Sequence, residues 1–80
     1  MNLPSQFSYL FPEFDIKSID LDKHSDIVIE RILRYGGVKE IRWLFKNYSK
    51  EKVKEFLRIK GKKRLDKRDY NFWKIILNGV

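Results

Sequence analysis

The sequence contains no cysteine, one histidine and two prolines among its 80 residues. Without cysteine the chain has no disulfide framework and no thiolate metal site, and it also lacks a glycine-rich phosphate loop. No cluster of metal-ligating residue types is present to replace them. We therefore expect a protein that is not an enzyme and has no cofactor and no metal site.

Long apolar runs are also missing. No stretch approaches the roughly 20 apolar residues needed to cross a bilayer, and the N-terminus lacks a basic segment followed by an apolar one. We expect a soluble, cytoplasmic protein without a membrane partner, in keeping with the absence of cysteine. Eighty residues suffice for one domain, residues 1–80.

No segment alternates apolar and polar residues as a half-buried strand does, so we expect an all-α chain. Residues 1–21 are predicted to form an irregular, aromatic-rich arm, because Pro4 and Pro12 disfavour helix in their neighbours and the apolar residues have no sustained period. So many aromatic side chains favour an arm that lies across a helical body, residues 22–78.

The body should contain four helices in a compact domain. The first, about residues 23–35, has Asp22 as its N-cap and ends at Gly36-Gly37. Its apolar arc spans about half the circumference, wider than a surface helix needs, which predicts a central position. Apolar residues spaced at three and four predict a second helix over residues 38–47.

Ser49 is the expected N-cap of a third helix, about residues 50–60, which should end at Gly61 and lead into a basic connector, residues 61–65. A fourth helix should begin after Asp66, in a capping box. The side chains that we expect it to bury are Phe72, Trp73, Ile76 and Leu77. The first three helices have the lengths and short joins of a helix-turn-helix unit.

Charge is sorted along the chain. Residues 1–30 hold two lysines and six acids, whereas residues 31–80 hold sixteen lysines and arginines and five acids. The densest stretch, residues 58–68, has seven bases and one acid, and Asp66 is the first acid to follow the connector's bases. Such a segment is either a solvated loop or a contact for a polyanion or an acidic protein.

Two further basic groups accompany this connector. Lys39, Arg42 and Lys46 lie beside Trp43, off the apolar stripe of the second helix, where cations would neutralise phosphates and the indole would stack on a base. Alternatively, Trp43 packs against the arm or the fourth helix, and the bases are a solvated rim.

The third helix carries Lys50, Lys54 and Arg58 in one row, next to Glu51 and Glu55, which can pair with Lys54 and Arg58. In a helix-turn-helix arrangement this helix enters the major groove. Its contacts would be Ser49, Lys50, Lys52, Lys54 and Arg58. A row so rich in lysine would hold DNA better than it would distinguish its bases.

The full set of residues expected to bind nucleic acid or an acidic partner is Lys39, Arg42, Trp43, Lys46, Lys50, Lys54, Arg58, Lys60, Lys62, Lys63, Arg64, Lys67 and Arg68. His24 lies at the edge of the first helix's apolar arc, and we expect it to be half-buried with a hydrogen-bond partner. The acids Asp20, Asp22 and Asp26 lack a second catalytic group.

A longer pattern combines Val28-Ile29 and Arg31-Ile32-Leu33 with Arg42-Trp43-Leu44-Phe45, and ends at Phe72-Trp73. Over most of residues 12–77 it resembles a family of small bacterial and archaeal helical proteins with no assigned activity. Members are often encoded beside nucleotidyltransferase-type toxins of the AbiEii kind. The resemblance implies an antitoxin-like or accessory role and draws attention to six residues: His24, Arg31, Arg42, Trp43, Phe72 and Trp73.

Two hypotheses follow. In the first, the chain is a non-enzymatic binding module of a toxin–antitoxin-like pair, and its basic C-terminal half binds DNA, RNA or an acidic partner, which includes the toxin itself. In the second, the chain is a protein-interaction or accessory subunit. The aromatic arm and the acidic N-terminal part then bind a neighbouring protein, and the bases serve solubility.

Overall fold

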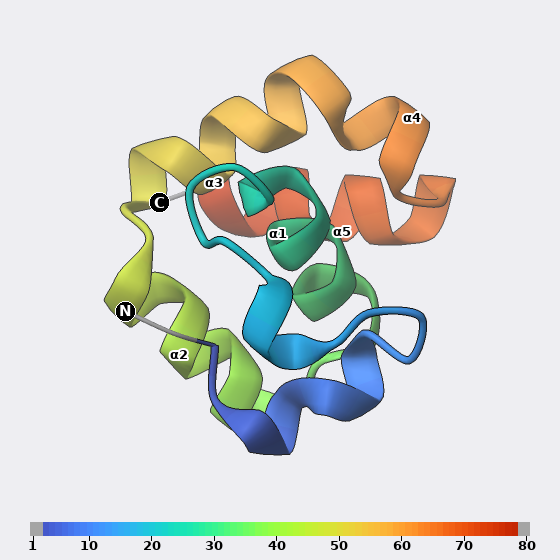
Figure 1. Ribbon diagram of the computed structural model, residues 1–80. Coiled ribbons are helices and arrows are strands. Elements are labelled where there is room, and N and C mark those ends of the chain that lie inside the picture. The colour runs from blue at the N-terminus through green and yellow to red at the C-terminus, as the bar shows by residue number, and fades with distance from the viewer. Residues whose placement is uncertain (1–2, 79–80) are drawn as a thin grey trace.

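Helix α1, Ser25–Tyr35, lies at the centre of the fold, and the other elements surround it (Figure 1). The computed structural model describes residues 3–78. Val28, Ile29 and Ile32 of α1 have no exposed surface, because the N-terminal arm, α2 (Val38–Asn47) and the later helices all supply side chains to one core. The prediction of a central first helix is confirmed, as are the bounds predicted for the second.

The N-terminal arm lies against the helical body, as expected. It is more regular than predicted, since it forms two 3-10 helices, η1 (Ser5–Leu10) and η2 (Ile16–Ser18). Its buried apolar residues include Leu3, Phe7, Leu10, Phe11 and Ile19. Arg31 of α1 fixes the middle of the arm, because its guanidinium donates to the Leu10 carbonyl oxygen at 2.8 Å and pairs with the Glu13 carboxylate.

The start of α1 differs from the prediction. Asp22 is not the N-cap: the carboxylate of Asp20 accepts from the backbone N–H groups of Asp22 (2.8 Å) and Lys23 (3.0 Å), and this turn delays the helix to Ser25. Short acidic side chains readily make such local turns.

The prediction for His24 is half right. His24 is exposed rather than half-buried, but it has the expected partner, since its Nδ1 accepts from the backbone N–H of Asp20 at 2.9 Å.

Gly61 does not end the third helix. Ser49 caps α3 (Lys50–Phe56) as predicted, accepting from the Lys52 N–H at 3.1 Å, and the chain then continues through a π-helical turn, η3 (Leu57–Gly61), into α4 (Lys62–Arg64). The backbone of Gly61 is helical, and a Cβ there would lie 2.9 Å from Cδ1 of Tyr70. The glycine therefore allows close packing, and the expected connector is helical up to Arg64.

The last helix, α5 (Lys67–Asn78), begins as predicted. The Asp66 carboxylate accepts from the backbone N–H of Asp69 at 2.9 Å.

The burial of α5 is only partly as predicted. Trp73 and Leu77 are buried, and the indole N–H of Trp73 donates to the Leu33 carbonyl oxygen of α1 at 3.1 Å. The predicted burial of Phe72 and Ile76 is wrong, because α5 turns that side away from the core; they are 55% and 43% exposed.

Within residues 3–78 the chain is helical and contains no strand, so the prediction of an all-α fold is confirmed. The radius of gyration is 12.0 Å, close to the value of about 12 Å expected for a compact chain of this length. None of the helices in this range has the length and apolar character to cross a membrane.

Replacing Gly61 by alanine provides a test of the packing between η3 and α5. Helix propensity alone would make the substitution stabilising by about 1 kcal/mol. The contact with Tyr70 predicts the opposite, a loss of about 1–3 kcal/mol from overpacking. Urea unfolding followed by circular dichroism distinguishes the two signs. In a Tyr70→Ala background the same substitution should become neutral or stabilising; a loss of equal size there would contradict the contact.

The Glu13–Arg31 pair should make stability depend on pH at the acid end. The hydrogen bond from Arg31 lowers the pKa of Glu13 from 4.5 to about 2, so its contribution is complete above pH 4.5 and disappears as the pH falls toward 2. We expect Glu13→Gln to lower the free energy of unfolding at neutral pH and to match the wild type near pH 2. Glu55→Gln, on an exposed residue of α3 beyond its first turn and without an ion pair in the described chain, should show no such trend.

Candidate functional site

The basic row and the basic connector predicted from the sequence lie on one continuous helical run. α3, η3 and α4 follow one another from Lys50 to Arg64 without interruption, a length of about 22 Å at the usual rise per residue. This run forms one edge of the molecule (Figure 1). It carries eight lysines and arginines and only two acids, Glu51 and Glu55.

Two bases of this run face α1 and are paired. Lys60 pairs with Asp26, and Arg64 donates to Glu30 at 3.3 Å. In the sequence Asp66 is the first acid that could pair with the connector's bases; the structure corrects this, because acids 34 residues earlier come into range when α1 packs along the run. Lys60 and Arg64 are therefore tied to the fold.

Glu30 is the most important of these acids. Its side chain is only 12% exposed and lies 3.8 Å from the Arg34 guanidinium as well as 3.3 Å from that of Arg64. A carboxylate so far removed from water requires compensation by cations. The two arginines thus hold a buried charge between α1 and α4.

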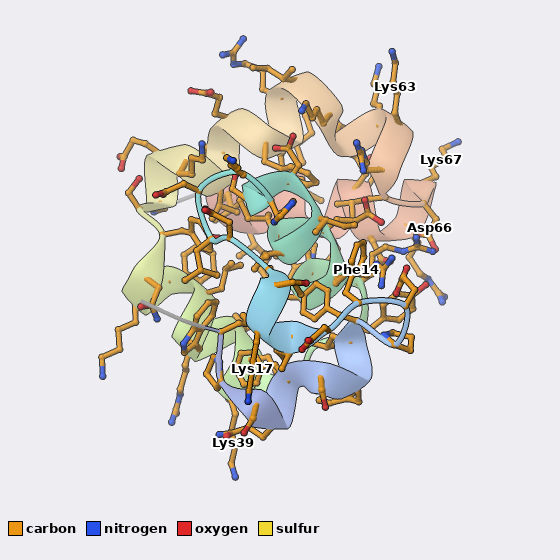
Figure 2. All side chains as sticks on the ribbon, in the orientation of Figure 1. Phe14, Lys17, Lys39, Lys63, Asp66 and Lys67 are labelled. Carbon is orange, nitrogen blue, oxygen red and sulfur yellow. The ribbon has the colours of Figure 1, made fainter. Side chains whose placement is uncertain are left out.

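Four further bases lie at the end of the run and at the start of α5. Lys62, Lys63, Lys67 and Arg68 are exposed, and none makes an ion pair with the residues that the structure describes. Lys63 and Lys67 project from the same corner of the molecule (Figure 2). We call Lys62, Lys63 and Lys67 the basic corner. Its cations are available for an external anion.

The predicted row on α3 leads toward this corner. Arg58 is exposed, as is Lys52, whereas Lys50 and Lys54 are partly buried. The expected pairs with Glu51 and Glu55 do not form within residues 3–78. The Ser49 hydroxyl is occupied as the helix cap.

The bases of α2 lie elsewhere. Lys39, Arg42 and Lys46 are exposed, but Figure 2 places Lys39 at the opposite end of the view from Lys63 and Lys67. The structure therefore does not bring all the predicted binding residues together. It separates an α2 group from the run that leads to the basic corner.

Trp43 is engaged in packing, one of the two alternatives for this residue. The ring of Phe7 from the arm meets it edge-on, with centroids 5.3 Å apart, and Tyr48 lies at 6.3 Å on the same indole. Its backbone carbonyl accepts from the Asn47 side chain at 2.9 Å. An indole contacted by two rings has less surface left for a nucleobase.

The arm leaves few apolar side chains for a partner. Phe7 and Phe11 are in the core, while Tyr9 (57%) and Phe14 (41%) stay exposed. Tyr9 borders a groove of about 840 Å³ between the arm and α1, and Arg34 and Tyr35 form its other side. Sequence reasoning did not find this groove, because its two sides are 25 residues apart.

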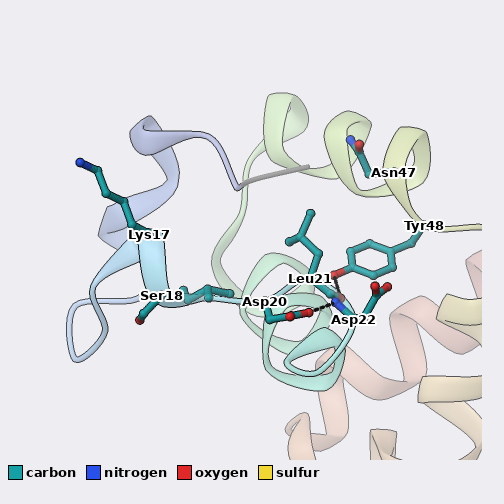
Figure 3. A pocket seen from close by; sticks show the side chains of 8 residues that line it. Lys17, Ser18, Asp20, Leu21, Asp22, Asn47 and Tyr48 are labelled. Carbon is teal, nitrogen blue, oxygen red and sulfur yellow. Dashed lines mark hydrogen bonds between the residues drawn. The ribbon is translucent and has the colours of Figure 1, made fainter.

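A second hollow, of about 550 Å³, lies between the end of the arm and α2 (Figure 3). Tyr48 forms part of its wall and donates its hydroxyl to the Leu21 carbonyl oxygen at 2.6 Å. Burial, reinforced by Asp22 and Asp20, raises the pKa of Tyr48 to about 12, so this phenol stays protonated at neutral pH. The Asp20 carboxylate beside it already accepts two backbone N–H groups in the turn before α1. No group of three metal-ligating side chains occurs in the described part of the chain.

Residues 7–57 match DUF6922, described as a family of unknown function. The chain belongs to this family. The match agrees with the expected resemblance to a family without an assigned activity. Comparisons with curated proteins and with solved structures find no match.

The DUF6922 match runs from Phe7 in the arm, through α1 and α2, to Leu57 at the start of η3. It therefore includes the ring contact between Phe7 and Trp43, the Arg31 contacts with the arm and, of the basic row, Lys50 and Lys54 but not Arg58. The basic corner and the whole of α5 lie beyond it. The two parts meet through the pairs that Asp26 and Glu30 make with Lys60 and Arg64.

The pairing of Arg64 predicts a difference between two neighbouring bases. Arg64→Ala should lower the free energy of unfolding by about 1–3 kcal/mol, because it removes a partner from the buried Glu30 carboxylate. Lys63→Ala removes the same charge from an exposed position and should stay within about 0.5 kcal/mol of the wild type. Urea unfolding of the two variants checks this. Equal effects would show that the Glu30 pair contributes nothing measurable.

Proposed function

We propose that this DUF6922 member is a non-enzymatic binding module that holds the phosphate backbone of nucleic acid along the α3–η3–α4 run and the basic corner. The proposal depends on one observation: exposed cations without an ion pair in the described chain continue along one edge of the molecule, from Lys52 and Arg58 to Lys62, Lys63 and Lys67. Cations so placed release the counterions condensed on a polyanion, which is the main source of affinity for nucleic acid.

The chemistry of this edge favours backbone binding over recognition of a base sequence. Lysine is a compact point charge that suits phosphate, whereas bidentate contacts to base edges come mostly from arginine, asparagine and glutamine. Arg58 is the only such side chain on the run that is free of a partner in the described residues. A run of about 22 Å would face about six base pairs of a duplex.

Two finer features belong to the same proposal. α2 and α3 are joined by Tyr48 and Ser49 alone, which suits a helix-turn-helix unit with α3 as the helix at the groove. The resemblance to proteins encoded beside nucleotidyltransferase-type toxins supports an antitoxin-like or accessory role. In that role the module would serve a toxin partner in the cytoplasm while it holds DNA or RNA.

The test is the salt dependence of binding to fluorescent duplex DNA and duplex RNA, measured by anisotropy. The triple variant Lys62/Lys63/Lys67→Ala should reduce the log–log slope by about 2–3, since each neutralised phosphate contributes about 0.9. The matched control is Lys39/Arg42/Lys46→Ala, which removes the same charge from α2 and should leave the slope nearly unchanged.

Two outcomes would contradict the proposal. One is no binding of the wild-type chain to either duplex at low salt. The other is an equal loss of slope in both triple variants, which would mean that net charge alone, and not the edge formed by α3 to α4, attracts the polyanion. A preference for one duplex would identify whether DNA or RNA is the ligand.

A further inference from the structure

Helix α5 is apolar on two sides. One side, with Trp73 and Leu77, is buried against the core. On the other side Phe72, Ile75 and Ile76 are 55%, 70% and 43% exposed. Residues at these spacings, three and four apart, lie next to one another on a helix, so they form one continuous patch, which we call the α5 apolar face.

A surface helix of a small domain needs only one apolar stripe. Isolated exposed apolar residues are ordinary, but contiguous ones mark interaction sites. The α5 apolar face is also held in place, because the Phe72 ring meets the Trp73 indole edge-on with centroids 5.2 Å apart, and Trp73 is itself fixed to the Leu33 carbonyl oxygen of α1. The face is therefore a preformed surface on a rigid helix.

The charges around the face indicate what covers it. Arg68 lies one turn before Phe72 on the same side of α5, and Lys67 and Lys74 share one flank. None of these three forms an ion pair in the described chain. A second copy of the chain, also at a net charge of +7, would bring like charges together. A lipid surface suits a rim that is rich in lysine and arginine, whereas this face has Asp69 at its other edge.

We propose that the α5 apolar face is the docking surface for an acidic amphipathic helix of a partner protein. Apolar side chains of that helix would cover Phe72, Ile75 and Ile76, and its carboxylates would meet Arg68, Lys67 and Lys74, in the manner of other helix-in-groove contacts. The inference does not require nucleic-acid binding, and Lys67 is the one residue that the two proposed surfaces share. It places the protein contact on α5, outside the family match, and not on the aromatic arm.

The experiment uses the whole chain and a synthetic helical peptide with a leucine stripe and glutamates at the remaining positions. Titration of the isotopically labelled protein should shift the NMR signals of Phe72, Ile75, Ile76 and Arg68. Ile75→Lys should weaken binding by about tenfold or more, as expected for a side chain at the centre of an interface. The matched control is Val38→Lys on α2, since Val38 is 69% exposed against 70% for Ile75; its affinity should stay at the wild-type value.

Other results would overturn the proposal. Equal binding of a scrambled peptide of the same composition would show that charge alone, and not the α5 apolar face, makes the contact. Sedimentation that shows a wild-type dimer, and a monomer after Ile75→Lys, would assign the face to a second copy. Binding to phosphatidylglycerol vesicles that is lost with Ile75→Lys would assign it to lipid. Circular dichroism of each variant verifies that helix content is unchanged.

Discussion

The whole structure depends on the burial of α1 from several sides at once. Val28, Ile29 and Ile32 have no contact with water, and a chain of 80 residues can surround a helix so completely only if every other segment contributes. The arm contributes Phe7, Leu10 and Phe11 to the core, and α5 contributes Trp73 and Leu77. The arm is thus a structural layer of the domain, and removing it would expose the core and not merely shorten the chain.

The charges obey the same constraint. The acids of the first thirty residues and the bases of the rest are separated along the chain, but folding places Asp26 beside Lys60 and Glu30 beside Arg64. Part of the sorted charge is therefore neutralised within the molecule. Most of the exposed bases without an ion pair in the described chain lie in two groups, one on α2 and one along the run from α3 to the start of α5.

Sequence reasoning predicted most of what short-range chemistry decides; the exception is the start of α1, where the Asp20 carboxylate makes a turn and Asp22 is not the N-cap. The bounds of α2 follow from apolar spacing, and the starts of α3 and α5 follow from the caps Ser49 and Asp66. Its other errors lie where residues farther apart in the chain decide the outcome. A glycine often marks the end of a helix, but Gly61 lies within one. It is a glycine because the ring of Tyr70 leaves no room for a side chain. Phe72 and Ile76 belong to an apolar pattern that covers two sides of α5. The pattern alone does not show which of these sides packs against α1.

The same limit applies to the candidate site. The basic residues could be found from composition, but their division into paired, free and remote groups depends on where α1 and α2 lie. The two acids that decide the pairing precede their bases by 34 residues. The excess of apolar residues in α5, six among residues 70–77, was a signal of its second apolar face.

The π-helical turn η3 sets the phase between the two ends of the helical run. Its wide turn accommodates one more residue than an α-helical turn would, so side chains after Gly61 are rotated by about 100° relative to a continuous α-helix. That rotation decides which of Lys62, Lys63 and Arg64 points to Glu30 and which point to solvent. A change of one residue in the length of η3 would exchange their roles, and would thereby convert a stabilising arginine into a surface cation and leave the buried carboxylate to a different base.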